Sequence, residues 1–357
     1  MDNVFTVAVI GCGAIAENSH FPAFEKLGNV RVKYACDIIK AKAEKMKEKY
    51  SFVEKAIEDY REALLDSEVE AVYVLTHNLD HYQMTLEALR AGKHVLCEKP
   101  VTVNYDMSLD MKKEADKCKR ILNIGLVNRF GNAANKLKGM IADGLLGDVY
   151  HVYCSFRAFH GVPGLGGPFT SKYESGGGAL IDTGIHYLDL IGYVLGGLEI
   201  KNVTCDTYNT IGEDLKAYKF KGMWSADSAD IENGVFDVDE FATGYIRAKG
   251  VNISFNGGWT QNLDITDRYI DFLGTKGGVR FDYGKKTIVF TNAETLETAD
   301  LTPEKNNFFC TQTEELMKSC RTGVKSVTNV DNIIVTMELM DALYKSAELG
   351  KEVSLCE

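Results

Sequence analysis

The sequence predicts an α/β protein of two domains: an N-terminal doubly wound parallel sheet over residues 1–124 and a C-terminal α+β domain over residues 125–357. The first prediction rests on short apolar runs that alternate with helical segments, which is typical of a parallel sheet covered by helices. The second rests on a change near residue 125, after which strand-like runs follow one another without helices between them. A chain of 357 residues is long enough for two domains of ordinary size.

In the first domain, five apolar runs are expected to form strands, at residues 7–10, 30–36, 71–75, 94–97 and 121–124. Helices are expected between them, at residues 14–27, 40–50, 57–65, 82–91 and 105–118. Gly92 supplies the stop signal after the fourth helix. Because helical segments separate the strands, the strands are expected to run parallel.

In the second domain, a helix is expected at 133–143 and strands at 149–156, 241–247, 251–255, 269–273 and 287–290. Gly257-Gly258 and Gly277-Gly278 are interpreted as turns between some of them. The consecutive strands predict a large, open, mostly antiparallel sheet with helices on one side. Two helices, at 308–320 and 331–349, close the chain, and the polar stretch 206–236 is expected to be a long excursion.

The turn after the first strand carries the strongest functional signal. The run at 7–10 breaks at Gly11 and Gly13 and passes into a helical pattern, the context in which a glycine-rich turn cradles a pyrophosphate. Asp37 ends the second strand, near the ~20-residue spacing of an acid that binds an adenosine ribose and disfavours a 2′-phosphate. We therefore predict a Rossmann-type site for NAD rather than NADP, formed by Gly11, Gly13, Ala14, Ile15 and Asp37. The alternative is a tight turn that serves packing only.

Composition excludes several other classes of protein. The net charge of −11 argues against general binding to nucleic acid or to an anionic membrane surface. No apolar run approaches the ~20 residues that cross a bilayer, and the N-terminus lacks the regions of a signal peptide. The nine cysteines are scattered, odd in number and without a CxxC pair, which argues against a zinc site, any other metal site and a disulfide framework. A reducing, cytoplasmic setting is expected.

Two segments carry side chains suited to acid–base chemistry. Lys99 follows the strand at 94–97 and precedes Pro100, so it is held at the sheet edge where ligands bind, and the Lys99–Pro100 bond is a candidate for a cis bond. Asp182 and His186 follow three glycines at 176–178 and are spaced i, i+4, on one helix face, where the acid can fix the tautomer of a general base. The alternatives are a solvated turn lysine and a structural Asp–His pair.

Further candidates flank these segments. Cofactor contacts are predicted for polar side chains at the ends of the strands, namely Thr76, Asn78, His81, Glu98 and Lys99, although for His81 a packing role is favoured. The Gly- and Pro-rich stretch at 159–168 is interpreted as an ordered substrate loop. Substrate contacts are predicted for Lys99, Arg157, Phe159, Tyr173, Asp182 and His186.

Taken in order, three motifs resemble those of the Gfo/Idh/MocA family, whose members include glucose–fructose oxidoreductase and inositol dehydrogenase. They are Val-Ile-Gly-Cys-Gly-Ala-Ile-Ala, His-Val-Leu-Cys-Glu-Lys-Pro and Gly-Gly-Gly-Ala-Leu-Ile-Asp-Thr-Gly-Ile-His. Lys99, Asp182 and His186 match the family's catalytic Lys and its Asp-x-x-x-His pair, and the segment at 128–130 resembles the entry to the second domain. The chain departs from the family pattern at His77, where Pro is frequent, and at Pro168, where an aromatic is common.

The resemblance implies reversible hydride transfer between NAD and a ring secondary alcohol of a sugar, glycoside or cyclitol. His186 would take the hydroxyl proton, oriented by Asp182, and Lys99 would hydrogen-bond the same oxygen. It also implies a homodimer or homotetramer packed through the second domain's sheet. Two alternatives stay open: a redox-neutral enzyme that recycles tightly bound NAD during oxidation and elimination on a glycoside, and a non-enzymatic dinucleotide sensor.

Overall fold

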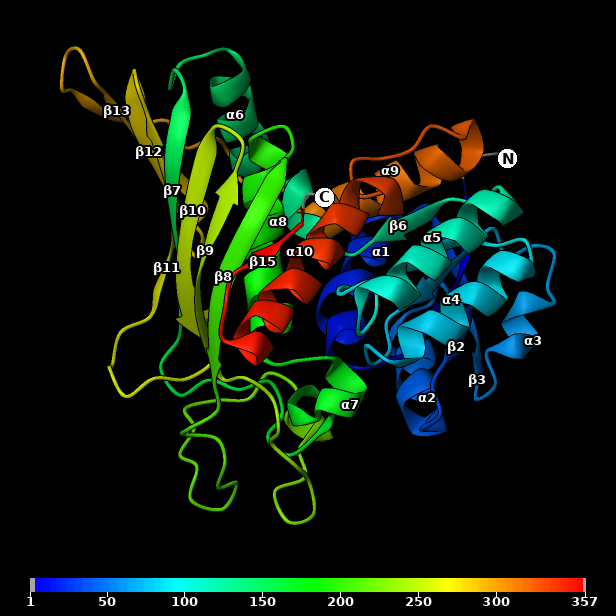
Figure 1. The fold of residues 1–357 in the computed structure, drawn as a ribbon. Coiled ribbons are helices and arrows are strands. Elements are labelled where there is room, and N and C mark those ends of the chain that lie inside the picture. Colours follow the sequence, from blue (N-terminus) through cyan, green and yellow to red (C-terminus); the bar gives the residue numbers. More distant parts are fainter. Residues whose placement is uncertain (1–3, 356–357) are drawn as a thin grey trace. The chain divides into compact units, whose positions relative to one another are not determined.

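The computed structural model describes residues 4–355, and residues 4–127 with Asn307–Ile334 form the first of its two units (Figure 1). The strands of this unit are β1 Phe5–Ile10, β2 Val30–Cys36, β3 Val53–Ile57, β4 Ala71–Val74, β5 His94–Cys97 and β6 Leu122–Ile124. They form one sheet in the order β3-β2-β1-β4-β5-β6, and each neighbouring pair is parallel. This confirms the predicted doubly wound sheet. The strand order reverses beside β1, the place where ligands bind in such sheets.

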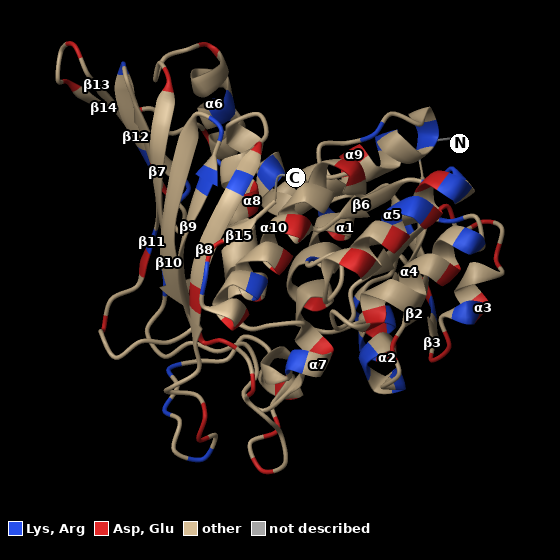
Figure 2. Cartoon of the chain, in the orientation of Figure 1, with Lys and Arg blue, Asp and Glu red and all other residues tan. Residues whose placement is uncertain are grey.

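Helices cover this sheet. They are α1 Phe21–Leu27, α2 Lys40–Lys49, α3 Arg61–Leu64, α4 Asp80–Arg90, α5 Tyr105–Cys118 and α9 Phe308–Thr322. Every residue of β1 is buried, as expected for a strand covered on both faces. The helix predicted at 14–27 is present, with a π turn at Ala16–His20 before α1. Figure 2 shows acidic and basic residues interspersed along these helices. In α5, Lys112 and Asp116 form an ion pair.

The sequence prediction was wrong at the sheet edge next to β2. A helix was expected at 57–65, but the chain forms β3 and only the short helix α3 there. β3 has a single neighbour, and its Glu54 and Lys55 are exposed. Charged residues are typical of edge strands, where they discourage pairing with another chain, but they obscure the alternating apolar pattern from which a strand is predicted.

The division into units differs from the expected boundary at residue 124, because the segment Asn307–Ile334 returns to the first unit. Helix α9 packs against α1, and Leu316 is fully buried in the core of the first sheet. The hydroxyl of Tyr73 on β4 donates to Thr313 Oγ1 at 3.3 Å. An amphipathic helix read from sequence shows that one face is buried, but not which core receives it.

The second unit comprises Asn128–Asn306 and residues 335–355 and contains a nine-stranded sheet. Its strands are β7 Val149–Arg157, β8 Ile200–Tyr208, β9 Phe241–Ala248, β10 Val251–Gly258, β11 Asp267–Gly274, β12 Gly277–Asp282, β13 Thr287–Asn292, β14 Thr298–Asp300 and β15 Val353–Ser354. The order is β14-β13-β12-β11-β7-β10-β9-β8-β15, and only the β7–β10 pair is parallel. The large, mostly antiparallel sheet is therefore confirmed.

One face of this sheet is covered by helices α6 Asn132–Ala142 and α8 Ile185–Val194, and most of α10 Val330–Leu349 belongs to the same unit (Figure 1). The stretch at 209–240 is a long excursion, as expected, whose only regular element is a 3₁₀ turn at Ala226–Ser228. None of the helices between residues 4 and 355 is long and apolar enough to span a bilayer.

Two glycine pairs that were interpreted as turns lie inside strands instead. Gly257 and Gly258 end β10, and Gly277 and Gly278 begin β12. A Cβ on Gly257 would lie 2.4 Å from the ring of Phe156 on the neighbouring strand. Gly257 and Gly277 therefore make room for the rings of Phe156 and Phe290 on neighbouring strands, which a turn-based interpretation does not consider.

Candidate active site

The predicted pyrophosphate turn has the geometry that such a turn requires. Gly11 has a φ of +94°, and a Cβ there would lie 2.5 Å from the carbonyl oxygen of Leu75, so only glycine fits. A Cβ on Gly13 would meet no atom within 4 Å, which means that open space lies beside the turn. Ala14 and Ile15 begin the helix that follows. The turn thus leaves room for an anionic group at a helix start.

Asp37 is held in a fixed orientation beside this turn. Its Oδ2 accepts from the backbone N–H of Cys12 at 2.9 Å, and its Oδ1 accepts from that of Ile39 at 2.8 Å. Asp37 and Ile39 border a cavity of about 160 Å³ that is also lined by Gly11, Gly13 and Thr76. Ile38, 85% exposed, lines it as well and offers an apolar surface to a base. These residues fit the adenosine end of NAD.

Of the other predicted cofactor contacts, His81 has a structural role. It is buried, and its Nδ1 and Nε2 lie 2.9 Å from the carbonyl oxygen of Pro100 and 3.2 Å from that of Thr76. Burial lowers the pKa of His81, and the ring lies between two strand-end turns. Asn78 lies in one of these turns, and its backbone carbonyl oxygen accepts from the hydroxyl of Thr102 at 3.4 Å.

Lys99 is fixed at the end of β5 by buried neighbours. The Lys99–Pro100 bond is cis. The carboxylate of Glu98 is buried; its Oε2 accepts from the backbone N–H of Lys99 at 3.1 Å, and its Oε1 lies 2.9 Å from Nε2 of His20. Burial raises the pKa of Glu98, but the contacts with His20 and Lys99 together outweigh this effect and leave the pKa below its ordinary value. His20, from the π turn before α1, is a neighbour of the motif that the sequence did not reveal.

A buried carboxylate accepts hydrogen bonds from the start of the helix that carries Asp182 and His186. The helical turn Leu180–Gly184 leads directly into α8. Asp239 Oδ1 accepts from the N–H of Gly178 at 2.7 Å and from the hydroxyl of Tyr344 at 2.8 Å, and its Oδ2 accepts from the N–H of Leu180 at 2.8 Å. Burial raises the pKa of Asp239, and the three donors oppose this rise. Asp239 thus satisfies the N–H groups at the helix start.

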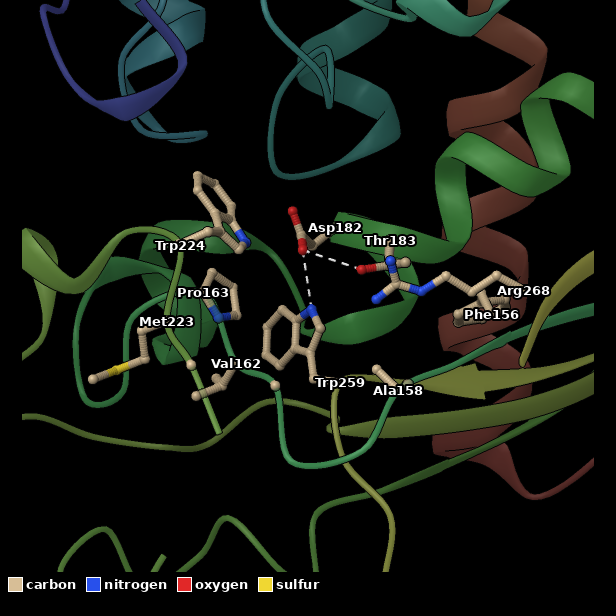
Figure 3. Close-up of a pocket in the computed structure, with 13 residues that line it drawn as sticks. Phe156, Ala158, Val162, Pro163, Asp182, Thr183, Met223, Trp224, Trp259 and Arg268 are labelled. Atoms are coloured by element: carbon tan, nitrogen blue, oxygen red, sulfur yellow. Dashed lines mark hydrogen bonds between the residues drawn. The ribbon is translucent and has the colours of Figure 1, made fainter. Parts of the chain in front are cut away.

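Asp182 lies at the wall of a cavity of about 390 Å³ in the second unit (Figure 3). Its Oδ2 accepts from the indole Nε1 of Trp259 at 3.0 Å and from the hydroxyl of Thr183 at 3.3 Å. The cavity is lined by residues of the substrate loop, the excursion and the sheet, namely Phe156, Ala158, Gly161, Val162, Pro163, Asp182, Thr183, Gly222, Met223, Trp224, Gly258, Trp259 and Arg268. Asp182, one of the predicted substrate contacts, is among these lining residues.

The other predicted substrate residues of the second unit lie outside this lining. Arg157 forms an ion pair with Asp267 at 2.5 Å, and the arginine that reaches the cavity is Arg268. The ring of Phe159 lies under the ammonium group of Lys221, at 4.3 Å, and Tyr173 is 78% exposed on the short helix Lys172–Ser175. Neighbouring residues on a strand point to opposite faces, so sequence distance alone does not identify the side chain that enters a cavity.

Three glycines of the stretch at 159–168, which was interpreted as an ordered substrate loop, pack against the excursion. A Cβ would lie 2.5 Å from Ser228 Oγ at Gly164, 2.0 Å from the carbonyl oxygen of Asp230 at Gly166, and 1.9 Å from that of Ser228 at Gly167. Gly161 does border the cavity. The substrate loop and the excursion therefore pack directly against each other. Their apolar side chains form a separate buried cluster that includes Trp259.

His186 contacts a residue that was not among the predicted site residues. Its Nδ1 lies 3.3 Å from Nδ2 of Asn128, and Oδ1 of Asn128 accepts from Nζ of Lys286 at 3.1 Å. Asn128 follows Val127 in the 3₁₀ turn where the second unit begins. Asn128 could have been found from the motif Asn128-Arg129-Phe130, but Lys286 lies in a hairpin turn without any sequence signal.

Two family models match this chain. One describes an oxidoreductase family with an NAD-binding Rossmann fold and matches residues 5–126. The other describes the GFO/IDH/MocA C-terminal domain and matches residues 134–280. The chain belongs to the Gfo/Idh/MocA family. Its cofactor is NAD, in agreement with the cradle formed by Gly11, Gly13 and Asp37.

Relatives within the Gfo/Idh/MocA family match over most of the chain. D-glucoside 3-dehydrogenase of Escherichia coli is 29% identical over 98% of this chain and 97% of its own length. Myo-inositol 2-dehydrogenase of Thermotoga maritima is 26% identical over 81% of this chain and 78% of its own length. A structure of levoglucosan dehydrogenase with NADH has the same fold, with a TM-score of 0.86 and 18% identity over 99% of both chains.

Proposed function

We propose that this Gfo/Idh/MocA oxidoreductase is an NAD-dependent dehydrogenase that acts on a ring secondary alcohol of a sugar, glycoside or cyclitol. The observation that carries the proposal is the carboxylate of Asp182, which is held by Trp259 at the wall of a cavity and lies one helical turn before His186. The names of the relatives, a glucoside dehydrogenase and an inositol dehydrogenase, support the same class of substrate.

Bound NAD supplies the hydride acceptor, and this chain's own residues handle the proton. In the proposed reaction, His186 takes the proton of the substrate hydroxyl as the hydride leaves the same carbon. Asp182 keeps the imidazole oriented, and the ammonium group of Lys99 hydrogen-bonds the substrate oxygen and stabilises its developing negative charge. In the reverse direction the same groups return the proton to the carbonyl oxygen.

The cavity beside Asp182 suits a neutral polyhydroxylated ring. Trp259 and Phe156 offer apolar ring surfaces, while Asp182, Thr183 and Arg268 offer hydrogen-bonding groups. Trp224, from the excursion, is 54% exposed and lies on the opposite side of the cavity from Arg268 in Figure 3. We propose that this side receives the group attached to the ring, so that a glycoside fits as well as a free sugar.

A panel of substrates tests the proposal. Sugars, glycosides and inositols are incubated with the protein and NAD, and NADH formation is followed by absorbance while the substrate is followed by chromatography. We expect at least one of these compounds to be oxidised with matching NADH formation. Reaction only with simple alcohols or hydroxy acids would contradict the proposed substrate class. Consumption of a glycoside without net NADH would assign the protein to the redox-neutral alternative instead.

We expect NAD to be preferred over NADP, because the carboxylate of Asp37 borders the ribose end of the cavity and repels a 2′-phosphate. In Asp37→Ser this repulsion disappears, and the ratio of kcat/KM for NAD to kcat/KM for NADP should fall about 10-fold or more. The exposed Asp59→Ser, on the following loop, serves as the control. Equal kcat/KM for the two cofactors in the unaltered protein would refute this prediction.

We also propose a homodimer or homotetramer that packs through the sheet of the second unit. The face opposite α6 and α8 exposes Tyr153, 48% exposed, and Val289, 36% exposed. Aromatic and apolar side chains on an open sheet favour burial against a second copy. Light scattering at micromolar concentration should give a mass of two or four chains, and Tyr153→Glu should lower it. A monomeric mass for the unaltered protein would refute the assembly.

The setting of the protein in the cell stays a prediction. The eight cysteines that lie within residues 4–355 are all free thiols. Burial raises the pKa of several of them, including Cys97 and Cys154, so that they pack as small apolar side chains. These observations support a reducing, cytoplasmic setting.

A further inference from the structure

Trp224 is a half-exposed tryptophan at the wall of the cavity beside Asp182 (Figure 3). The only other tryptophan of the chain, Trp259, lines the same cavity and is buried. The Trp224 ring packs edge-to-face against the ring of Phe169, with 4.8 Å between the ring centres. Exposing an indole ring to water is unfavourable, because burial of its apolar surface would stabilise it. A half-exposed tryptophan at a cavity wall therefore points to a ligand that covers it.

The backbone on both sides of Trp224 is fixed to the substrate loop. The N–H of Lys221 donates to the carbonyl oxygen of His160 at 2.8 Å, and the N–H of Ser225 donates to that of Pro163 at 2.8 Å. The position of Trp224 is thus set by hydrogen bonds that do not involve its side chain. A ring on a fixed backbone can receive a ligand without the entropic cost of ordering a loop.

A buried carboxylate also fixes the base of the excursion. The carboxylate of Glu240 accepts from the backbone N–H groups of Thr210, Ile211 and Gly212 at 2.9, 2.6 and 2.5 Å. The backbone carbonyl oxygen of Glu240 accepts from the N–H of Trp259 at 2.8 Å. The base of the excursion is therefore attached to the residue whose indole holds Asp182.

The cavity has a polar side and an apolar side. Figure 3 shows Thr183 and Arg268 on one side of Trp259. The residues on the other side have carbon-rich, uncharged side chains, namely Val162, Pro163, Met223 and Trp224. Met223 is held there, because its Sδ accepts from the N–H of Leu165 at 3.4 Å. A Cβ on Gly222, which also lines the cavity, would meet no atom within 4 Å, so free space adjoins this apolar side.

The chemistry of the apolar side selects among the groups that a sugar can carry. The cavity of about 390 Å³ falls in the range of about 300–1,000 Å³ that is typical of pockets for drug-sized ligands, which are larger than one monosaccharide. A second sugar would bring hydroxyl groups that need hydrogen-bond partners, and the apolar side chains supply few. An aromatic group needs none, stacks on an indole ring and makes favourable contacts with a thioether such as that of Met223.

We propose that the side of the cavity formed by Trp224 is a subsite for an aromatic aglycone, so that the preferred substrates are aryl glycosides. The sugar ring lies beside Asp182, Thr183 and Arg268, and the aryl group stacks on the indole ring of Trp224. The inference rests on the proposed function, in which a ring alcohol of the sugar is oxidised near Asp182, and it adds the chemical class of the group that the sugar carries. Trp224 takes no part in the chemical step and determines which glycosides bind.

Calorimetric titration of the protein saturated with NADH tests the subsite without turnover. The probes are matched phenyl and methyl glycosides of glucose, galactose and xylose in both anomeric forms, together with cyclohexyl glycosides, whose rings are of similar size but are not flat. For at least one sugar, we expect the phenyl glycoside to bind about 10-fold more tightly than the methyl glycoside, and more tightly than the cyclohexyl glycoside. The inference is overturned if no phenyl glycoside binds more tightly than both counterparts, or if disaccharides bind more tightly than phenyl glycosides.

Substitution of Trp224 identifies the side chain that receives the aryl group. Trp224→Ala should weaken binding of the phenyl glycoside about 10-fold and leave that of the methyl glycoside within about 2-fold, whereas Trp224→Phe should retain most of the affinity. Phe220→Ala removes another exposed aromatic side chain of the excursion, outside the cavity lining, and should change neither Kd. The ratio of the two Kd values does not depend on how much of a variant is folded. An equal loss of affinity for both glycosides in Trp224→Ala would contradict the aryl subsite.

Kinetics separate this inference from the proposed function. A contact with the aglycone is made both before and during hydride transfer, so Trp224→Ala should raise KM for the phenyl glycoside and leave kcat unchanged. Oxidation of methyl glycosides, without a Trp224-dependent preference for phenyl glycosides, would overturn the inference and leave the proposed function in place. Trp224-dependent binding of phenyl glycosides that are never oxidised would support the subsite and overturn the proposed function.

Discussion

Alanine at Lys99 or at His186 is expected to lower kcat by about 10²-fold or more, the usual scale for losing acid–base assistance. Lys99 follows β5 and His186 belongs to α8, and in the proposed reaction each variant removes one of the two groups that contact the substrate oxygen. Binding of NAD, measured by fluorescence titration, should change much less, because the cradle around Gly11, Gly13 and Asp37 stays intact.

The matched control is Lys47→Ala, which removes an exposed lysine from α2 and should leave kcat unchanged. A retained kcat in His186→Ala or Lys99→Ala, measured with a substrate identified by the panel, would mean that the altered residue has a structural role only. Because the two residues lie in different units, the two results are independent tests of the proposed reaction.

The second large effect is expected on stability, when the carboxylate of Asp239, which anchors the start of the active-site helix, is removed. Asp239→Ala leaves the N–H groups of Gly178 and Leu180 and the hydroxyl of Tyr344 without their acceptor in a buried setting. Each lost partner costs about 1–3 kcal/mol, so the free energy of unfolding of the second unit should fall by about 3 kcal/mol or more. Denaturant unfolding, followed by circular dichroism, measures the change.

Gly178→Ala tests the same anchor from the other side. A Cβ at this position would lie 1.8 Å from the carbonyl oxygen of Asp239, so the helix start must shift. We expect a loss of stability of about 1–3 kcal/mol, and a lower kcat because Asp182 and His186 shift with the helix. Asp206→Ala, an exposed position on β8, should stay within about 0.5 kcal/mol. If Asp239→Ala unfolds at the same denaturant concentration as the unaltered protein, the helix start is held by other contacts.

The sequence by itself determined the features that depend on local order. Apart from the edge strand β3, strands and helices could be predicted up to β6, because each of these elements buries a periodic set of apolar residues. The cradle could be predicted from Gly11, Gly13 and Asp37, since a strand, a tight turn and a helix start are contiguous in the chain. The position of Lys99 at a strand end follows in the same way. In each case the physical cause lies within a few tens of residues.

Only the tertiary structure decided which distant side chains meet. Helix α9 joins the core of the first unit, Arg268 rather than Arg157 enters the cavity, and Trp259 holds Asp182. Likewise, the contact of Lys286 with Asn128 joins positions that are 158 residues apart in the sequence. Burial patterns show that a side chain is covered, but the partner is selected by packing and hydrogen-bond geometry across the whole unit, which local sequence does not encode.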